Sequence, residues 1–139
     1  MNQSSPTVLI ADDPALAVAL SQAGFSVQVT GGGGPADFDR ILACQFGDIC
    51  VDFRKGLVLR RESPISLTLK ELQLLRYLIM RKGSTVSRAE LLAAVWGYRG
   101  HLTRTVDVHV ASLRQKMEDD PHRPKYVRTV RGKGYLFNG

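Results

Sequence analysis

The chain has 139 residues, of which 44% are hydrophobic and 23% are charged, so a globular core is expected and a disordered chain is excluded. No apolar run reaches the roughly 18 residues that a membrane span needs. The first residues also lack the basic start and long apolar core of a secretory signal. These features predict a cytoplasmic protein with no membrane association, formed by one ordinary domain and at most a small appendage.

The net charge of +6 is unevenly distributed along the chain. Residues 1–48 carry one arginine and five aspartates, whereas residues 49–139 carry 18 cations and eight acids. So basic a segment favours a polyanionic partner, because bound phosphates release condensed counterions. Charge alone suits DNA, RNA, a heparin-like polymer or an anionic membrane equally. Cys44 and Cys50 form no metal-ligand pattern and are expected to be reduced thiols.

The opening of the chain predicts a β-α-β segment. An apolar run at 8–10 leads to Asp12-Asp13-Pro14, and aspartate followed by proline is a favourable helix start, because the carboxylate caps free amides. The helix is expected to end near Gly24, and residues 25–30, FSVQVT, alternate apolar and polar side chains like a strand.

A run of glycines and a second helix are expected next. Residues 31–34 are four glycines without the lysine of a phosphate-binding loop, which favours a flexible linker. Residues 37–46 predict a short helix, with Phe38, Ile41 and Leu42 on one side. A unit of 48 residues buries little apolar surface alone, so we expect it to depend on the rest of the chain or on a second copy.

The second part, residues 49–139, begins with three short strands, predicted at 49–53, 57–61 and 65–67. Two capping-box patterns follow, Thr68 with Glu71 and Ser87 with Glu90, and each predicts the start of a helix. The first helix extends to about Arg81 and the second to Trp96, which is expected in the core. The first helix is expected to bury one set of aliphatic side chains: Leu69, Leu72, Leu75, Leu78 and Ile79.

A third helix is predicted at about 104–118, with two different sides. Its apolar residues recur at intervals that place them on one stripe: Val106, Val110, Leu113 and Met117. The opposite stripe carries a cation, hydrogen-bonding groups and small apolar groups without a central carboxylate: Arg104, Val108, Ala111 and Gln115, with Ser112 and Thr105 near its edge. Such a surface can lie against phosphates and base edges, although an ordinary amphipathic helix with a solvated side fits the same pattern.

The chain closes with a predicted hairpin, in which strands at 127–130 and 135–137 flank the turn Arg131-Gly-Lys-Gly134. N-terminal antiparallel strands, three helices and a C-terminal hairpin form the α+β layout of a winged helix-turn-helix, whose third helix enters the major groove of DNA.

Three strings in residues 49–138 closely resemble the effector domain of OmpR/PhoB-type response regulators: SLTLKELQLLRYLIMRKGSTVSRAELLAAVWG, RTVDVHVASLRQKME and YVRTVRGKGYLF. The resemblance implies a transcription regulator that binds direct-repeat sites on double-stranded DNA as a pair. It also implies that loop 97–102 is a candidate surface for RNA polymerase, and it leaves a homodimer open.

The resemblance places the residues expected to contact DNA on the third helix and the hairpin, with Arg114 on a phosphate and Arg131 in the minor groove. On the helix they are Arg104, Thr105, Val108, His109, Ser112, Arg114 and Gln115, and on the wing (residues 127–137) they are Thr129, Arg131, Gly132, Lys133 and Tyr135. His109 flanks the apolar stripe, so packing and phosphate contact are both open for it.

The chain departs from this family in the middle of the third helix, where many relatives carry arginine or lysine and this chain has Ala111 and Ser112. Fewer cations there imply fewer phosphate anchors and a shallower salt dependence of binding. Specificity would then depend on Val108 against a thymine methyl, and on hydrogen bonds from Gln115 or Ser112.

The larger departure lies upstream, where VLIADDP resembles the opening of a receiver domain that is cut short. Asp12 and Asp13 occupy the place of its paired magnesium-binding acids. A helix-capping role by itself is enough to explain Asp13, however. No phosphoacceptor aspartate follows on a third strand, and two acids make a poor Mg²⁺ site. We therefore expect no metal or cofactor, and regulation that does not depend on aspartate phosphorylation.

No catalytic motif is present, so the sequence predicts a protein that is not an enzyme. The alternative function is a winged helix that docks protein, with residues 1–48 acting as a dimerising or ligand-sensing cap. A protein-docking side of the third helix should be more apolar at its centre and accompanied by fewer wing cations.

Overall fold

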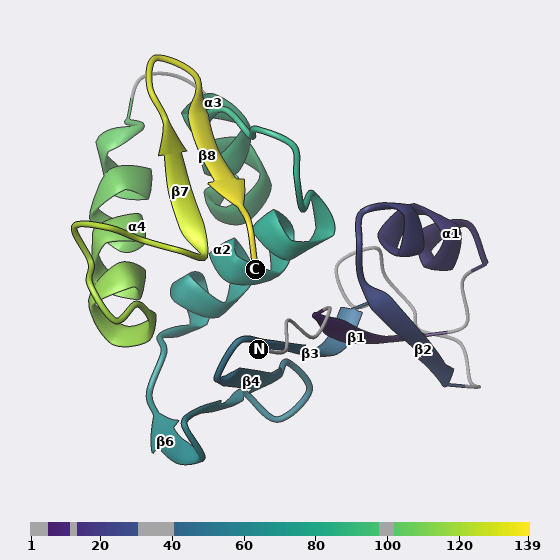
Figure 1. The fold of residues 1–139 in the computed structure, drawn as a ribbon. Coiled ribbons are helices and arrows are strands. Elements are labelled where there is room, and N and C mark those ends of the chain that lie inside the picture. The colour runs from purple at the N-terminus through teal and green to yellow at the C-terminus, as the bar shows by residue number, and fades with distance from the viewer. Residues whose placement is uncertain (1–5, 12–13, 31–40, 98–101) are drawn as a thin grey trace. The chain divides into compact units, whose positions relative to one another are not determined.

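The computed structural model describes residues 6–11, 14–30, 41–97 and 102–139. The chain forms two compact units, Met1–Ser66 and Leu67–Gly139. Figure 1 shows a sheet and a helix in the described part of the first unit, and helices with a hairpin in the second. The expected domain boundary between residues 48 and 49 stays a prediction; in the structure, the strands on either side of it pair with each other.

The first unit begins with the predicted β-α-β segment. Strand β1 (Thr7–Ala11), helix α1 (Pro14–Gln22) and strand β2 (Ser26–Thr30) follow one another, and β1 pairs in parallel with β2. The helix begins at the predicted proline, whose fixed φ suits a first turn. Gly24 (φ 99°) then lets the chain reverse into β2.

The helix predicted at 37–46 is wrong over its described part, because Ile41–Phe46 form strand β3. Residues 37–40 lie outside the described residues. A short apolar run fits either a strand or a buried helix, and here hydrogen bonding to neighbouring strands on both sides selects the strand. Strand β3 is antiparallel to β1 on one side and to β4 on the other, with an irregularity opposite Leu9 and Ile10. Its burial alternates accordingly, with Cys44 and Phe46 inside and Gln45 exposed.

Three further antiparallel strands complete the sheet. Strands β4 (Ile49–Asp52) and β5 (Leu57–Arg60) confirm the predictions, and β6 (Ser63–Ile65) starts two residues before the predicted 65–67. The six strands lie in the order β2-β1-β3-β4-β5-β6. Cys44 faces Val51 and Cys50 faces Gln45, so the two cysteines alternate to opposite sides of the sheet and both are free thiols, as predicted.

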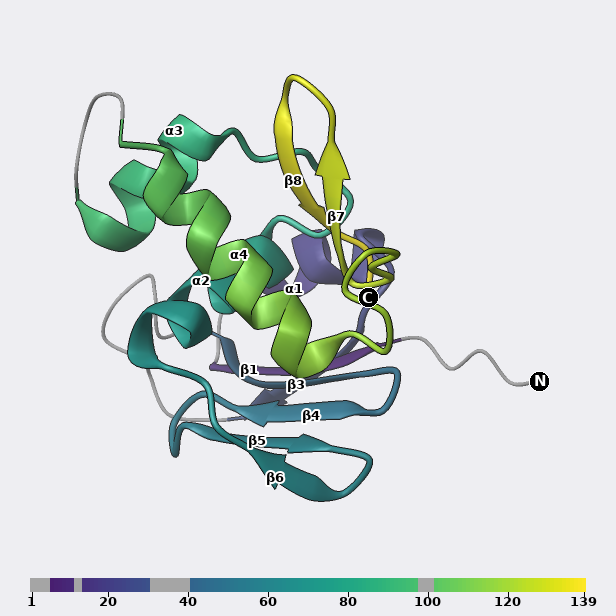
Figure 2. The same ribbon diagram turned by 90° about the vertical axis from the view of Figure 1, so that its left-hand side faces the viewer.

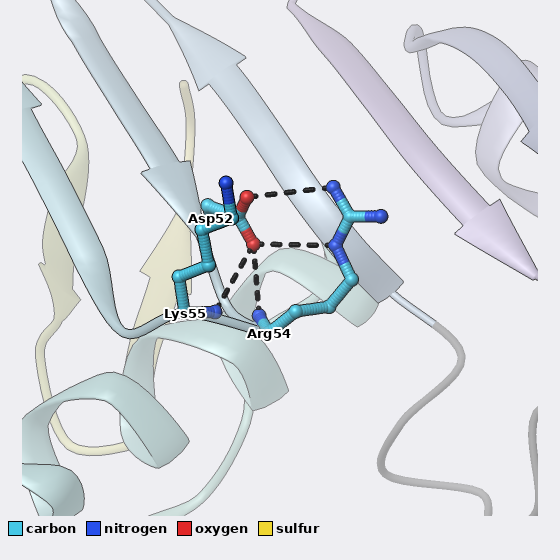
Figure 3. Close-up of polar contacts among 3 residues, drawn as sticks. All are labelled: Asp52, Arg54 and Lys55. Carbon is cyan, nitrogen blue, oxygen red and sulfur yellow. Dashed lines mark hydrogen bonds and ion pairs between the residues drawn. The ribbon is translucent and has the colours of Figure 1, made fainter.

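The turn between β4 and β5 is closed by one carboxylate (Figure 3). The Oδ1 atom of Asp52 accepts hydrogen bonds from the backbone N–H groups of Arg54 (3.0 Å) and Lys55 (3.3 Å), and from Nε of Arg54 (3.3 Å). Burial acts to raise the pKa of Asp52, but the bonds from Arg54 and Lys55 lower it overall. The carboxylate therefore replaces a backbone acceptor in the turn.

In the second unit, three helices precede a hairpin. Helix α2 (Leu69–Met80) starts with the complete predicted capping box of Thr68 and Glu71. Helix α3 (Arg88–Leu91) starts at Ser87, whose hydroxyl accepts from the Glu90 amide, and continues into a π-helical turn, Leu92–Trp96. Helix α4 (Arg104–Met117), β7 (Val127–Val130) and β8 (Gly134–Phe137) confirm the predicted third helix and hairpin.

The core of this unit follows the predicted periodicity, except that Leu69 is exposed and Leu72 is half-buried. The whole apolar stripe of α4 is buried, and it is accompanied by Leu74, Leu75, Leu78 and Ile79 of α2, Leu91, Leu92 and Val127, and Phe137. Leu69 was expected inside but is 66% exposed, because it lies in the first turn, about 240° around the helix from Leu75. Leu74 takes a buried place that the sequence did not predict.

Candidate nucleic-acid interface

Helix α4 has the two sides that its sequence predicts. Val106 and Val110 are fully buried, whereas Arg104, Ala111 and Gln115 are exposed. Val108 is 58% exposed near the middle of the outward side. In Figure 2, α4 lies in the foreground, with α3 behind its N-terminal end and the β7–β8 hairpin projecting beside it. The outward side of α4 is accessible along its length.

An open depression of about 510 Å³ covers the N-terminal half of α4. Arg104, Val108 and Ala111 line it from the helix, and Arg88 lines it from α3. Arg88 was not among the predicted site residues, because the sequence string Ser87–Glu90 identified only a helix start. Its Nη1 atom lies 3.1 Å from Oδ2 of Asp107, an ion pair that only the tertiary fold brings together. Arg88 adds a cation beside the exposed side of α4.

A second hollow, of about 240 Å³, lies beside the turn of the hairpin. Three cations line it, namely Arg88, Arg131 and Lys133, together with Asp107 and Thr129. Arg131, Gly132 and Lys133 are exposed at the turn, where Gly132 (φ 74°) adopts a left-handed conformation that suits glycine. The structure thus places cationic side chains of the hairpin and of α3 around one hollow.

Tyr135 supports the hairpin from inside. Only 8% of Tyr135 is exposed, and its hydroxyl donates a 2.7 Å hydrogen bond to Oδ1 of Asp107. Burial and this bond raise the pKa of Tyr135 to about 12. The predicted DNA contact of Tyr135 stays a prediction, and the geometry gives its hydroxyl a positioning role between α4 and β8.

Strand β8 is also held by a close backbone approach to Val86, in the segment before α3. Val86 and Tyr135 exchange backbone hydrogen bonds of 2.8 and 2.9 Å. A Cβ atom on Gly134 would lie 2.0 Å from the carbonyl oxygen of Val86, and its φ of 150° is rare for other residues. Glycine is therefore required where β8 meets the segment that leads into α3.

Arg114 joins α4 to β7. Its Nε donates to the carbonyl of Val127 (2.9 Å) and its Nη2 donates to Oγ1 of Thr129 (2.8 Å). Its guanidinium carbon lies 5.5 Å from the centroid of the Tyr135 ring, within the range of a cation–π contact. Burial lowers the pKa of Arg114, although the charges of Tyr135 and Glu118 act in the opposite direction. The phosphate contact expected of Arg114 stays a prediction, and the bonds observed make it an internal brace.

His109 and Trp96 pack together beside the exposed stripe. The two rings meet edge to face, with centroids 4.8 Å apart and planes at 69°. Nδ1 of His109 lies 2.8 Å from the carbonyl oxygen of Thr105, to which it donates in the tautomer that carries hydrogen on Nδ1. Packing, one of the two alternatives for His109, is therefore present, and a phosphate contact through Nε2 stays a prediction. Trp96, expected in the core, is half-buried.

A buried carboxylate connects α4 to α2. Glu71 is 2% exposed and accepts hydrogen bonds from Ser112, from Nζ of Lys116 (2.6 Å) and from the Thr68 amide (2.9 Å). Burial acts to raise the pKa of Glu71, but the bonds from Lys116 and Ser112 lower it overall. The hydroxyl of Ser112, a predicted DNA contact, thus already donates to Glu71, and Ser112 is half-buried.

Glu118, at the end of α4, organises the approach to β7. It is 2% exposed, and its carboxylate accepts hydrogen bonds from the amides of Lys125 (2.7 Å), Tyr126 (3.0 Å) and Val127 (2.9 Å). One side chain therefore holds the start of the hairpin against the end of α4. The sequence showed only the helix stop at residues 119–121.

Two negative findings concern the described part of the chain. It holds no cluster of three or more histidine, cysteine, aspartate or glutamate side chains that could bind a metal ion. None of its helices is long and apolar enough to cross a bilayer. Asp12, Asp13 and the four glycines at 31–34 lie outside the described residues.

The fold and the exposed helix define the class: the unit Leu67–Gly139 is a winged helix-turn-helix preceded by antiparallel strands. A family model described as "Transcriptional regulatory protein, C terminal" matches residues 62–137, which is more than half of the chain. The chain belongs to this family, the effector domain of OmpR/PhoB-type response regulators.

Relatives agree with this assignment. Over 94 residues the chain is 46% identical to the probable transcriptional regulator ycf27 of Galdieria sulphuraria, covering 66% of this chain and 37% of that protein. Over 95 residues it is 43% identical to the sensory transduction protein RegX3 of Mycolicibacterium smegmatis, covering 67% and 41%. The chain therefore spans about two fifths of the length of these curated relatives.

Solved structures are similar as well. The DNA-binding domain of RstA from Klebsiella pneumoniae, in complex with the RstA box, matches with a TM-score of 0.63 and 30% identity, over 68% of this chain and 95% of that one. The response regulator DrrB of Thermotoga maritima, an OmpR/PhoB homolog, matches with a TM-score of 0.67 over 100% of this chain and 82% of that one. At 21% identity, the DrrB match shows likeness of fold alone.

Proposed function

We propose that this protein regulates transcription by binding double-stranded DNA sequence-specifically, with α4 in the major groove and the β7–β8 wing at the minor groove. The observation that carries the proposal is the exposed side of α4, where Arg104, Val108 and Gln115 face outward beside a cationic hairpin. The major groove admits an α-helix, and the RstA structure shows a related domain on its own DNA box.

The roles of individual residues follow from exposure. Arg104 and Arg88 are cations at the N-terminal half of α4, suited to phosphates on one side of the groove. Val108, 58% exposed, suits a thymine methyl, and Gln115 suits an adenine edge. Arg131 and Lys133 at the hairpin turn suit the narrow, electronegative minor groove.

Arg114 and Tyr135 support this surface through internal contacts. Their contacts with Thr129, Val127 and Asp107 fix the hairpin relative to α4. We propose that they hold the two DNA-binding elements at a constant separation, and that Arg114 contacts phosphate only through nitrogens that these bonds do not use.

We also propose that binding is not switched by aspartate phosphorylation. Strand β3, ILACQF, carries no carboxylate. Of the nearby acids, Asp52 closes a turn with Arg54, and Asp48 pairs with Nε of Arg61 at 2.8 Å. Neither has the place of a phosphoacceptor at the end of a parallel third strand.

Further proposals concern location and partners. We infer cytoplasmic action and binding to direct-repeat sites as a pair, because the family comprises regulators of transcription. A contact between RNA polymerase and loop 97–102 is proposed on resemblance alone, since residues 98–101 lie outside the described residues. Membership of a regulatory family supports a binding protein over an enzyme.

Selection of duplexes from a random pool tests the proposal most directly, because it reports affinity, sequence preference and repeat spacing together. Enrichment of a motif present in two tandem copies is expected. Equal recovery of all duplexes, or binding that does not respond to salt, would contradict sequence-specific DNA recognition and would favour the protein-docking alternative.

A further inference from the structure

The two edges of the six-stranded sheet differ in how well they are protected. Strand β6 has three residues including Pro64, and two charged residues with positive φ, Arg61 (51°) and Glu62 (66°), stand just before it. Short length, proline and charge are the features that natural sheets use to prevent pairing with another chain. Strand β2, at the other edge, is SVQVT, five residues without charge or proline. Its register with β1 is regular throughout.

The backbone of β2 directs specific groups outward. The Ser26 amide donates to the carbonyl of Pro6 at 2.8 Å, on the side of β1. Successive residues of a strand point their backbone groups to opposite sides, so the N–H and C=O groups of Val27 and Val29 point away from β1. Among the strands of the described residues, β2 has β1 as its one neighbour.

The sequence of β2 reads almost the same in both directions about Gln28. If a second copy pairs antiparallel with its Gln28 opposite Gln28, then Val27 lies opposite Val29 of the second copy. These are the residues whose backbone groups point outward, so each valine pair exchanges both backbone hydrogen bonds, and the central glutamines form the non-hydrogen-bonded pair. The symmetry of the sequence and the direction of the backbone groups therefore select the same register.

The side chains also suit this pairing. Val27 and Val29 are in register with Val8 and Ile10, which are fully buried, so the valines lie on the apolar side of the sheet. Val29 is nevertheless 49% exposed. Pairing would cover part of this surface with another valine, and it would bring no like charges together along the strand.

We propose that β2 is a homodimer interface, where two copies of this chain pair edge to edge about a two-fold axis at Gln28. The contact is isologous, with the same strand contributed by both copies. It goes beyond the proposed DNA binding and does not depend on it, because it concerns only the unit Met1–Ser66 and is measured without DNA.

Sedimentation velocity on the full chain over a concentration series tests the interface. The wild type should shift from monomer to dimer as concentration rises. Val29→Pro removes one outward N–H without affecting the ladder to β1, and Val29→Lys places like charges across the contact; both should abolish the dimer. Leu57→Lys is the matched control, since Leu57 is a 46% exposed aliphatic residue of β5, and it should leave the dimer intact.

A cross-link fixes the register and covers the case in which a variant at position 29 fails to fold. In a Cys50→Ser background, Gln28→Cys should form an intermolecular disulfide on mild oxidation, because Cα atoms of a non-hydrogen-bonded pair lie about 4.5 Å apart. Val29→Cys should not, since its equivalent in the second copy would be beyond about 7 Å. A wild type that stays monomeric at all concentrations would overturn the proposal. So would a dimer that Leu57→Lys dissociates, or one that does not cross-link through position 28.

Discussion

Arg131 stands at the turn of the hairpin, exposed and next to Gly132, so its side chain can extend into a groove without displacing other residues. We expect Arg131→Ala to weaken duplex binding by about 1–3 kcal/mol, because one cation at the minor groove is lost. A mobility-shift titration measures the change. Arg123→Ala is a suitable control, since Arg123 is an exposed cation of the loop before β7. Equal affinity of the Arg131 variant and the wild type would remove the wing tip from the interface.

Ala111 is an exposed, uncharged residue on the outward side of α4. We expect Ala111→Arg to add a phosphate contact and to steepen the slope of log K against log[salt] by about 1. The slope is obtained by fluorescence anisotropy on one duplex at several salt concentrations. Ala89→Arg adds the same charge to the adjacent helix α3, at another exposed position. A slope that the two variants change equally would show that net charge, and not the position on α4, sets the salt dependence.

At the scale of elements, α4 is held by carboxylates on its inner side. Glu71 joins α2 to Ser112 and Lys116, so Glu71→Gln should lower the free energy of unfolding by about 1–3 kcal/mol at neutral pH. Urea denaturation measures the loss, and Glu62→Gln, at an exposed turn, should change little.

The same contact has a pH dependence whose sign follows from the pKa. Because the pKa of Glu71 is lowered in the folded state, its stabilisation is present above the unfolded value of 4.5 and is lost as pH falls through the folded value. The difference in stability between wild type and Glu71→Gln should therefore shrink in acid. A difference that stays constant from pH 7 to pH 3 would contradict the assignment.

Elements with strong local signals were predictable from sequence. The stripe of α4 repeats at helical spacing, and Thr68 with Glu71 marks the start of α2, so both were confirmed. Strand β3 was not predictable, because the short apolar run ILACQF has no decisive period and its partners β1 and β4 select the extended form. The ion pair of Arg88 with Asp107 joins residues 19 apart, and no local pattern reports such a contact.

At the scale of the whole molecule, the chain combines an effector domain with a β-α-β segment that precedes it in the sequence. We expect that acetyl phosphate with Mg²⁺ will not modify the protein, because strand β3 carries no carboxylate that could accept a phosphoryl group. Intact-mass spectrometry measures this, with a receiver domain of ordinary length as the positive control. An added phosphoryl group on the chain would contradict this expectation.

The hydrogen bonds of Glu118 to the backbone before β7 make the neighbouring loop a suitable place for an insertion. The Glu118 carboxylate accepts hydrogen bonds from the amides of residues 125–127. Both ends of loop 119–124 are therefore anchored, whatever the sequence of the loop itself. A reporter peptide or fluorophore-binding tag inserted at His122–Arg123, both exposed, should leave the helix and hairpin in place. A label at this loop would thus allow DNA binding to be measured without altering the residues proposed to contact DNA.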